Sequence, residues 1–385
     1  MLYVGISTCC HKEPSQMNKK LTYAVLTSVL LLSFAYNIIF ASSTTFNQYY
    51  ASRSSSYIIY NDGGIYIAVS GLTGAIDYSG ANASTVIQSV VNALTSGGSI
   101  FLKSGTYTLT SHITSADNII WIGEGKSTKI TSESNNYSLY LGHNNRVTNI
   151  FFETFGSVAG SGTAIVISGK NDCMIDHCWF TNTHNAAIAL QLNPSRAIIT
   201  DNNIVSCTKY GIVMDSGKDV IISGNIIKDT TWQGIAAYGA SMDNLVIIGN
   251  NLESSSGSYD TAIQVASTGT IKRVSIQGNI VNGAVNYGIS LRVNDNTDYV
   301  LTDVTVSGNV IRNIANQAIY VYAINGNGNL SNISMSNNVI TDYGIGTIYK
   351  NGIKITSAQR VSIIGNIIRT TETASSDIRA IMLNQ

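Results

Sequence analysis

Hydrophobic and polar residues alternate along this chain in short runs, and from about residue 195 one such run recurs. Apolar and variable positions alternate, and a Gly-Asn or Asn-Asn pair and a further apolar residue follow. An alternation with a period of two predicts half-buried β-strands and not helices. The seven copies read IITDNNIV, VIISGNII, LVIIGNNL, VSIQGNIV, VTVSGNVI, ISMSNNVI and VSIIGNII.

The second Asn of each copy returns every 22 to 30 residues, a period typical of a solenoid. Each copy is followed by a second short strand that begins with Gly-Ile or Ala-Ile. Such a unit cannot bury its apolar face alone, but coils stacked about 4.8 Å apart would share one core. We therefore expect the Asn side chains to form a structural ladder that bonds the turns of adjacent coils. These residues are Asn203, Asn225, Asn250, Asn279, Asn309, Asn338 and Asn366.

The region before the clear repeats predicts weaker coils and one helix. Residues 170–194 place Cys178 where later coils have Asn, and residues 118–169 resemble two more coils. Ser84 can cap a helix that has an apolar face from Ile87 to Leu94 and stops at Gly97-Gly98. This helix would cover the first coil, whose open edge would otherwise promote aggregation. The fold class expected is all-β, a single-stranded parallel β-helix of about ten coils with a capping helix.

The N-terminus has the pattern of an export signal. Lys19 and Lys20 precede an apolar run over residues 21–40, and a small, polar stretch follows. The run is also about long enough to span a bilayer, so an uncleaved membrane anchor is the alternative. Both readings place the protein outside the cytoplasm, either secreted or anchored at the cell surface. We divide the chain into a leader (1–41), a strand or linker segment (42–75), a module with the helix (76–131) and the coils (132–385).

Composition excludes one class of partner. Only 11% of the residues are charged, and the 22 basic residues balance the 22 acidic ones. Nucleic-acid binding depends on neutralising phosphates, so a chain without a basic stripe gives no reason to expect a nucleic-acid partner. Cys173, Cys178 and Cys207 lack metal-ligand spacing, and we expect buried thiols.

A family resemblance adds to this interpretation. The stretch IQSVVNALTSGGSIFLKSGTYTLTSHI, followed by NIIWIGEGKSTKI, resembles the N-terminal module of the pectate lyase superfamily, and the later coils resemble its right-handed β-helix repeats. The resemblance covers roughly residues 76–385. It implies a right-handed parallel β-helix and a polysaccharide or surface glycan as partner. Fold alone does not select among the superfamily's lyases, hydrolases, epimerases, tailspikes and non-catalytic surface proteins.

If the chain follows the family's layout, the Gly/Ala-Ile strands and the loops before them line a substrate groove. Strand alternation then decides which side chains face outward. Aromatic rings there could stack on sugar rings, although a Tyr before Gly-Ile could instead cover the edge of a coil. Trp232 is the strongest individual candidate. The residues expected to bind substrate are Gln191, Trp232, Tyr238, Tyr259, Asp260, Gln264 and Tyr287.

Hydrolysis of a glycosidic bond normally requires two carboxylic groups about 5 to 10 Å apart. The predicted groove strands offer only Asp215, with Asp260 in a loop two coils away. The Gly-His-Gly motif and tandem aspartates of the superfamily's hydrolases are absent, and so is the Arg-x-Pro-x-x-Arg signature of its calcium-dependent pectate lyases. Neither specific activity therefore follows from the resemblance.

A lyase instead removes the proton beside a uronate carboxylate, with an Arg, Lys, Tyr or His base and a positive group that stabilises the enolate. Arg292 and Lys354 would lie two coils apart, at about 10 Å, with Tyr320 and Tyr322 between them. These four residues and Asp215 are the catalytic candidates. Solvated surface charge is the alternative for the two cations.

One pair of carboxylates suggests a cation site. Aligned coils would place Asp176 over Asp201, about 5 Å apart, beside His177. Two carboxylates at that distance would raise one pKa or recruit a divalent cation such as calcium. Alternatively, a nearby Lys or Arg neutralises them.

Two functions stay open at the level of sequence. One is a secreted polysaccharide-active enzyme with lyase-type or related uronate chemistry, and the other is a non-catalytic adhesive β-helix at the cell surface. The chain stops within a predicted strand at Leu383. We therefore expect either a partner subunit over that end or a longer natural protein.

Overall fold

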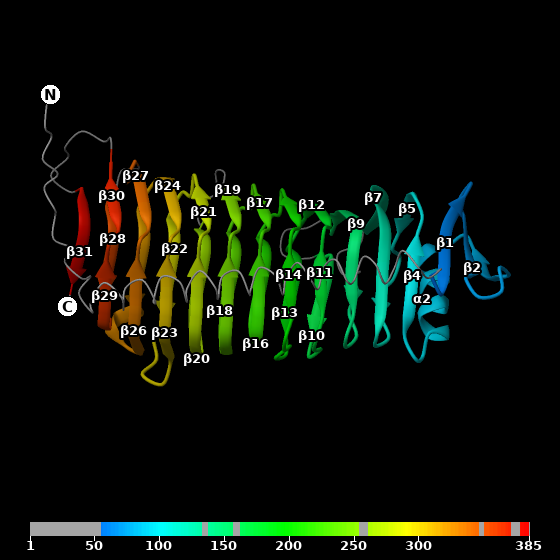
Figure 1. Ribbon diagram of the computed structural model, residues 1–385, viewed down its shortest axis with the longest axis horizontal. Helices are drawn as coiled ribbons and strands as arrows, with labels where there is room; N and C mark the ends of the chain where they lie inside the picture. The colour runs from blue at the N-terminus through cyan, green and yellow to red at the C-terminus, as the bar shows by residue number, and fades with distance from the viewer. Residues whose placement is uncertain are drawn as a thin grey trace, which may run out of the picture. The chain divides into compact units, whose positions relative to one another are not determined.

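The computed structural model describes residues 55–385 except 133–137, 157–161, 254–260, 346–349, 371–377 and 385. The chain divides into two units, Met1–Ser54 and Ser55–Gln385. The expected leader lies outside the described residues. The second unit is a parallel β-helix whose successive coils lie side by side (Figure 1).

The strands of this unit pair into three parallel ladders, which we call the first, second and third sheets. The first sheet consists of β6 (Ile113–Thr114), β8 (Leu139–Tyr140), β10 (Ile165–Ser168), β13 (Ala186–Gln191), the beginnings of β16 (Tyr210–Ser223), β18 (Gln233–Ile248) and β20 (Thr261–Gln277), β22 (Tyr287–Val293), β25 (Gln317–Ala323), β28 (Asn351–Thr356) and β31 (Arg379–Asn384).

The other two sheets share several long strands with their neighbours. The second sheet consists of β4 (Gly98–Leu102), the beginnings of β7 (Ile119–Ser132) and β9 (Arg146–Phe155), β11 (Met174–Asp176), β14 (Ile198–Thr200), the ends of β16, β18 and β20, β23 (Val300–Ser307), β26 (Asn329–Ser336) and β29 (Gln359–Ile364). The third sheet consists of β5 (Gly105–Thr108), the ends of β7 and β9, β12 (Trp179–Thr183), β15 (Asn203–Val205), β17 (Ile226–Lys228), β19 (Asn251–Glu253), β21 (Ile280–Asn282), β24 (Val310–Ile314), β27 (Val339–Tyr343) and β30 (Ile367–Arg369).

The Gly/Ala-Ile segments form the first sheet, as the repeat predicts. Ile212 pairs with Ile235, and Ile235 pairs with Ile263, so these buried side chains stack inside the coils. The residue before each Ile must be small. A Cβ added at Gly211 would lie 2.6 Å from the carbonyl oxygen of Gly234 on the next coil. Close stacking therefore explains why this position holds only Gly or Ala.

The predicted Asn ladder lies at the turn between the second and third sheets. Asn279 is fully buried, and its Oδ1 accepts hydrogen bonds from the backbone N–H of Asn250 (2.9 Å) and from Asn250 Nδ2 (3.0 Å). Its Nδ2 donates to the carbonyl of Ile247 and to Asn309 Oδ1, both at 3.0 Å. The same pattern repeats at successive coils, so each amide satisfies buried polar groups of its neighbours.

Asn203 was assigned to the ladder wrongly. Asn202 is the ladder residue, because its Nδ2 donates to Asn225 Oδ1 at 3.0 Å and its side chain is buried. Asn203 begins β15 and pairs with Ile226. In an Asn-Asn pair either residue can match the motif, and here the first one does. The Cys178 prediction is confirmed, since the Cys178 N–H donates to Asn202 Oδ1 at the equivalent place.

The residue before each ladder amide explains the other half of the motif. Gly224, Gly249 and Gly278 have φ of 64°, 66° and 60°, in the left-handed region. Glycine adopts this conformation without the Cβ clash that other residues meet, and Asn or Asp tolerates it best among the rest. The Gly/Asn-Asn pair thus combines a left-handed corner with an amide that bonds the next coil.

The N-terminal end of the stack is covered as expected. The helix α2 (Ala83–Ala93) buries Ile87, Val90 and Val91, and it contacts β5 and β6. It also contacts the antiparallel strands β2 (Ile65–Ser70) and β3 (Ile76–Gly80), while β1 (Tyr57–Asp62) joins this antiparallel group to β4. Figure 1 shows α2 beside β4 and β1.

The cap of α2 is Asn82 and not Ser84. The Asn82 side chain accepts a hydrogen bond from the Thr85 N–H, while Ser84 is buried inside the helix. Ser84 Oγ instead accepts from the Thr110 N–H at 2.9 Å, which ties the helix to the chain after β5.

The described part of the chain contains one further helical turn, η1 (Ile324–Gly326), and Cys173, Cys178 and Cys207 are free and buried, as predicted. Among the described residues there is no helix with the length and apolar character of a membrane span.

Replacing a ladder amide should destabilise the stack. Asn279→Ala leaves the buried N–H of Asn250 and the carbonyl of Ile247, both on the preceding coil, without their side-chain partner, and we expect a loss of about 3 kcal/mol in unfolding free energy. Denaturant unfolding followed by circular dichroism measures this. Asn203→Ala, which only begins β15, is the matched control and should cost less than about 0.5 kcal/mol. Equal losses in the two variants would contradict the assignment.

Candidate functional site

The outer face of the first sheet carries two rows of side chains, set by strand alternation. The first row contains Ala189, Val213, Ala236, Gln264, Ser290, Tyr320 and Lys354. The second row contains Gln191, Asp215, Tyr238, Ala266, Arg292, Tyr322 and Thr356. The outward positions predicted from the sequence are thus assigned to the correct face. Large polar and aromatic side chains gather from Tyr238 onward.

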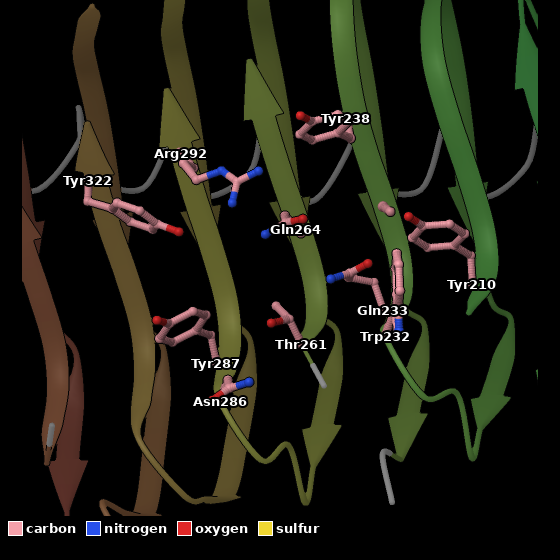
Figure 2. Close-up of a pocket in the computed structure, with 11 residues that line it drawn as sticks. Tyr210, Trp232, Gln233, Tyr238, Thr261, Gln264, Asn286, Tyr287, Arg292 and Tyr322 are labelled. Carbon is pink, nitrogen blue, oxygen red and sulfur yellow. The ribbon is translucent and has the colours of Figure 1, made fainter. Parts of the chain in front are cut away.

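A groove of about 800 Å³, which we call the aromatic groove, opens on this face over β16 to β25. Figure 2 shows its side chains coming from neighbouring strands toward one space. It combines five aromatic rings with three side-chain amides and one guanidinium, and its described lining residues include no carboxylate. The lining residues are Tyr210, Trp232, Gln233, Ala236, Tyr238, Thr261, Gln264, Asn286, Tyr287, Arg292 and Tyr322.

Arg292 spans the space above a small residue. Tyr238, Ala266 and Arg292 occupy equivalent positions on three successive strands, and Ala266 is fully buried. The Arg292 guanidinium therefore reaches across Ala266 toward Tyr238, and its carbon lies 5.5 Å from the centre of the Tyr238 ring. Arg292 Nε is buried without a hydrogen-bond partner. A buried donor without a partner is costly, so this guanidinium is suited to bind an anionic or hydroxyl-bearing ligand.

A hydrogen bond fixes the aromatic side of this contact. Asn294 Nδ2 donates to the Tyr238 hydroxyl at 3.1 Å across two coils. Asn294 Oδ1, like Arg292 Nε, is a buried polar atom that has no partner. The Tyr238 ring is 42% exposed, so it presents an apolar face to the groove while its hydroxyl is held.

Trp232 forms the opposite end of the groove. Its ring stands perpendicular to Tyr210, at 5.8 Å between centroids and 88° between planes. Lys209 Nζ lies 4.6 Å from the Trp232 ring centre, within cation–π range. Trp232 remains 36% exposed, and burial raises the pKa of the neighbouring Tyr210, with a smaller contribution from Tyr238. This end therefore offers an exposed ring in a fixed orientation.

Three tyrosines pack together at the other end. Tyr320 and Tyr322 are stacked at 4.1 Å, and Tyr287 lies 5.3 Å from Tyr320. Lys354 Nζ lies 5.0 Å from the Tyr320 ring, on the side away from Ser290. Partial burial lowers the pKa of Lys354. Lys354 and Arg292 belong to different rows and are separated by the stacked tyrosines.

The structure brings many of the predicted residues together. Tyr287, Trp232, Tyr238 and Gln264 line the aromatic groove, as do Arg292 and Tyr322. Their proposed roles remain predictions.

Other predicted residues lie elsewhere. Lys354 and Tyr320 are not among the lining residues, and Gln191 and Asp215 are exposed on the strands before Tyr238. Asp215 Oδ1 accepts a hydrogen bond from Ser216 Oγ at 2.7 Å. Tyr259 and Asp260 lie outside the described residues.

Gln233, Thr261 and Asn286 line the groove but were not singled out from the sequence. Gln233 and Thr261 pair in register between Tyr210 and Tyr287. Their signal was available, because each lies two residues before the buried Ile of its strand, as the two tyrosines do. An aromatic residue at this position indicates a sugar-stacking ring, whereas Gln and Thr at the same position give a weaker signal.

A family model for the right-handed β-helix region matches residues 120–281. The chain is a right-handed parallel β-helix protein. No curated protein matches its sequence. Solved β-helix structures are similar, at identities that establish the fold alone.

One similar structure is the A-module of the mannuronan C-5 epimerase AlgE4 from Azotobacter vinelandii, with 15% identity, a TM-score of 0.54, and coverage of 78% of this chain and 96% of that one. An exopolygalacturonase from Thermotoga maritima has 13% identity and a TM-score of 0.55, covering 75% of this chain and 88% of that one. The tailspike of Escherichia coli bacteriophage HK620, in complex with a pentasaccharide, has 13% identity and a TM-score of 0.53, covering 78% of this chain and 61% of that one.

The β-helix register overturns the proposed carboxylate pair. Asp176 pairs with Thr200, whereas Asp201 is a left-handed corner residue with φ of 55°. Asp176 is fully buried and accepts two 2.6 Å hydrogen bonds from Arg146. The predicted alignment of the two coils was shifted by one residue, and Arg146 neutralises the Asp176 carboxylate. Among the described residues no group of three or more His, Cys, Asp or Glu could hold a metal ion.

The contacts of Asp176 also shift two pKa values. Burial would raise the pKa of Asp176, but hydrogen bonds from Arg146 and His177 outweigh it and hold that pKa below its usual value. The hydrogen bond to Asp176 raises the pKa of His177. Arg146 and Asp176 therefore form a buried ion pair in the second sheet, and His177 is hydrogen-bonded to its carboxylate.

Removing the Asp176 charge should destabilise the protein in a pH-dependent way. Asp176→Asn removes the carboxylate charge that faces Arg146, which is 7% exposed, and we expect a cost of about 3 kcal/mol at neutral pH. Because the folded-state pKa is lowered, the stabilisation exists above the unfolded pKa of about 4 and is lost as pH falls through the folded value. Thermal melts at pH 7 and pH 3 should show the difference from wild type shrinking in acid.

Asp201→Asn is the control for this experiment, because Asp201 is exposed at the neighbouring corner. It should leave the melting temperature nearly unchanged at both pH values. If the Asp176→Asn variant is as stable as wild type at pH 7, the ion pair of Arg146 with Asp176 does not stabilise the fold.

Proposed function

We propose that this β-helix protein binds an acidic polysaccharide in the aromatic groove. The observation that carries the proposal is the combination of exposed rings with the half-buried Arg292, whose Nε is buried and has no hydrogen-bond partner. Aromatic faces pack on the apolar faces of sugar rings, while amides bond hydroxyl groups. Arg292 supplies the charge complementary to a carboxylate.

The comparisons support the same class of ligand. The similar structures are named as an epimerase of mannuronan, an exopolygalacturonase and a tailspike bound to a pentasaccharide. An extended ligand also suits the architecture, since the groove crosses five consecutive strands of one sheet. Action outside the cytoplasm, secreted or at the cell surface, belongs to this proposal and rests on the apolar run at residues 21–40.

Lyase-type or related uronate chemistry is the catalytic form of the proposal. Arg292 would neutralise the carboxylate of the uronate. This stabilises the developing enolate and so makes the adjacent C–H more acidic. Tyr322 pairs with Arg292 on the next strand, and its hydroxyl is our candidate either to accept the proton from that C–H or to donate one to the glycosidic oxygen as the C–O bond breaks. Two-carboxylate hydrolysis is less well supported, because the described lining residues include no carboxylate. Asp260, next to Thr261, is outside the described residues.

The non-catalytic alternative uses the same groove. A surface adhesin needs the stacking rings and the guanidinium but no proton acceptor. The two forms differ only in turnover, so binding and reaction must be measured on the same variants.

Removing the exposed ring should weaken binding. Trp232→Ala is expected to reduce polysaccharide affinity at least about ten-fold, or 1.4 kcal/mol, in isothermal titration calorimetry. Trp179→Ala is the matched control. Trp179 also lies beside a lysine, with Lys126 Nζ 5.8 Å from its ring centre, but it belongs to the third sheet. Equal effects of the two substitutions, or none from Trp232→Ala, would overturn the groove as the binding site.

Arg292 should determine charge selectivity. Arg292→Ala is expected to lower the affinity for acidic polysaccharides at least about ten-fold and the affinity for neutral ones less than about two-fold. The preference of the wild-type protein for acidic chains should decrease at high salt. Arg312→Ala, at an exposed position on the third sheet, is the control.

Turnover is followed on the same samples by unsaturated uronate absorbance and by new reducing ends. Turnover lost in both Arg292→Ala and Tyr322→Phe would support the lyase, while binding without turnover in wild type would favour the adhesin. An unchanged preference for acidic chains in Arg292→Ala would contradict the role given to the guanidinium.

A further inference from the structure

A second, smaller pocket lies on the same sheet, upstream of the aromatic groove. It has a volume of about 350 Å³ and is formed at β6, β8 and β10. We call it the upstream pocket, and no role in the proposed function has so far been given to it. Its lining includes His112, Thr114, Tyr140, Ser168 and Lys170.

The side chains of the upstream pocket repeat the chemistry of the aromatic groove. His112 packs edge-on against Tyr140 at 5.0 Å and 83°. His112 Nδ1 accepts a hydrogen bond from the Ser138 N–H at 3.2 Å, so the proton of a neutral ring lies on Nε2. Lys170 Nζ is 3.8 Å from Asp117 Oδ1, a loose ion pair in which the Lys170 side chain is 37% exposed. A ring, a hydroxyl and a cation thus meet in one hollow.

The sheet connects the two pockets in register. Tyr140 pairs with Val166, Val166 with Ala189, Ala189 with Val213, and Val213 with Ala236 in the floor of the aromatic groove. Four coil steps correspond to about 19 Å. The side chains of this row between the two pockets are short, from Val166 through Ala189 and Val213 to Ala236, so none of them projects far from the sheet.

The second row supplies polar groups beside the path. Gln191 is exposed and Ser168 pairs with it, while Asp215 is exposed on the following strand. An amide, a hydroxyl and a carboxylate can bond sugar hydroxyls. Asp215 would repel an acidic group placed beside it, so the acidic groups of a ligand would lie at Lys170 and Arg292 with hydroxyl groups between.

We infer that the upstream pocket is a distal binding site for the same polysaccharide chain, so that the protein binds long chains across both pockets. The inference rests on the proposed function and adds a required ligand length. Binding at the second pocket becomes intramolecular once a chain is held at the first, and affinity should therefore rise steeply when a chain is long enough to reach both.

The test compares chain lengths. Size-fractionated oligogalacturonate and oligomannuronate are titrated into the full protein, its Tyr140→Ala and Lys170→Ala variants, and Lys228→Ala. Lys228 is the matched control, because it is a similarly exposed, ion-paired lysine on the third sheet. We expect Tyr140→Ala and Lys170→Ala to lower the affinity for long chains about ten-fold and the affinity for short chains less than about two-fold. Lys228→Ala should change neither.

The outcomes separate the two claims. If Trp232→Ala weakens every length while Tyr140→Ala and Lys170→Ala change none, the aromatic groove binds sugar and the distal site is wrong. If wild-type affinity does not rise with chain length, the distal site is also wrong. If wild type binds neither acidic oligosaccharide at any length, the proposed function fails and the distal site fails with it. Lys170→Ala keeps the test valid should Tyr140→Ala not fold, because Lys170 lies at the surface.

Discussion

The amide ladder at the turn between the second and third sheets is the interaction on which the rest of this protein depends. Each ladder Asn from Asn202 to Asn338 bonds the coil before it and the coil after it, with hydrogen bonds of 2.9 to 3.1 Å from its backbone N–H to the next amide oxygen. A slip of one residue would break these bonds and would also turn each strand's apolar residues outward. The ladder therefore helps fix the register of all three sheets, and the core of Ile, Val and Leu adds the bulk of the stabilisation.

Register is also what makes the aromatic groove. Arg292 reaches Tyr238 only because a buried alanine, Ala266, occupies the same position on the strand between them. Trp232 and Tyr287 come from different coils and have no local relation in sequence. The site thus belongs to the stack and not to any one repeat, and a change in coil stacking would move its members apart together.

Sequence periodicity was sufficient to predict the solenoid, the Asn ladder and the outward face of the first sheet. These features repeat, so each copy corrects the interpretation of the others. Both register errors, Asn203 and the pair of Asp176 with Asp201, occurred in two adjacent irregular coils. There, His177-Cys178 and Asp201-Asn202 replace the usual Gly-Asn signal and leave the alignment ambiguous by one residue.

The site was less predictable, because it depends on side-chain reach and on neighbours from other coils. Spacing predicted Tyr320 and Tyr322 between Arg292 and Lys354, but it did not predict that the two rings stack or that Lys354 lies outside the lining of the aromatic groove. The most direct test of the account is a crystal structure of the protein soaked with a long oligouronate. We expect the sugar chain to cross the strands of the first sheet, with rings against Trp232 and Tyr287 and a carboxylate at Arg292. A chain bound on the second or third sheet, with the aromatic groove vacant, would contradict it.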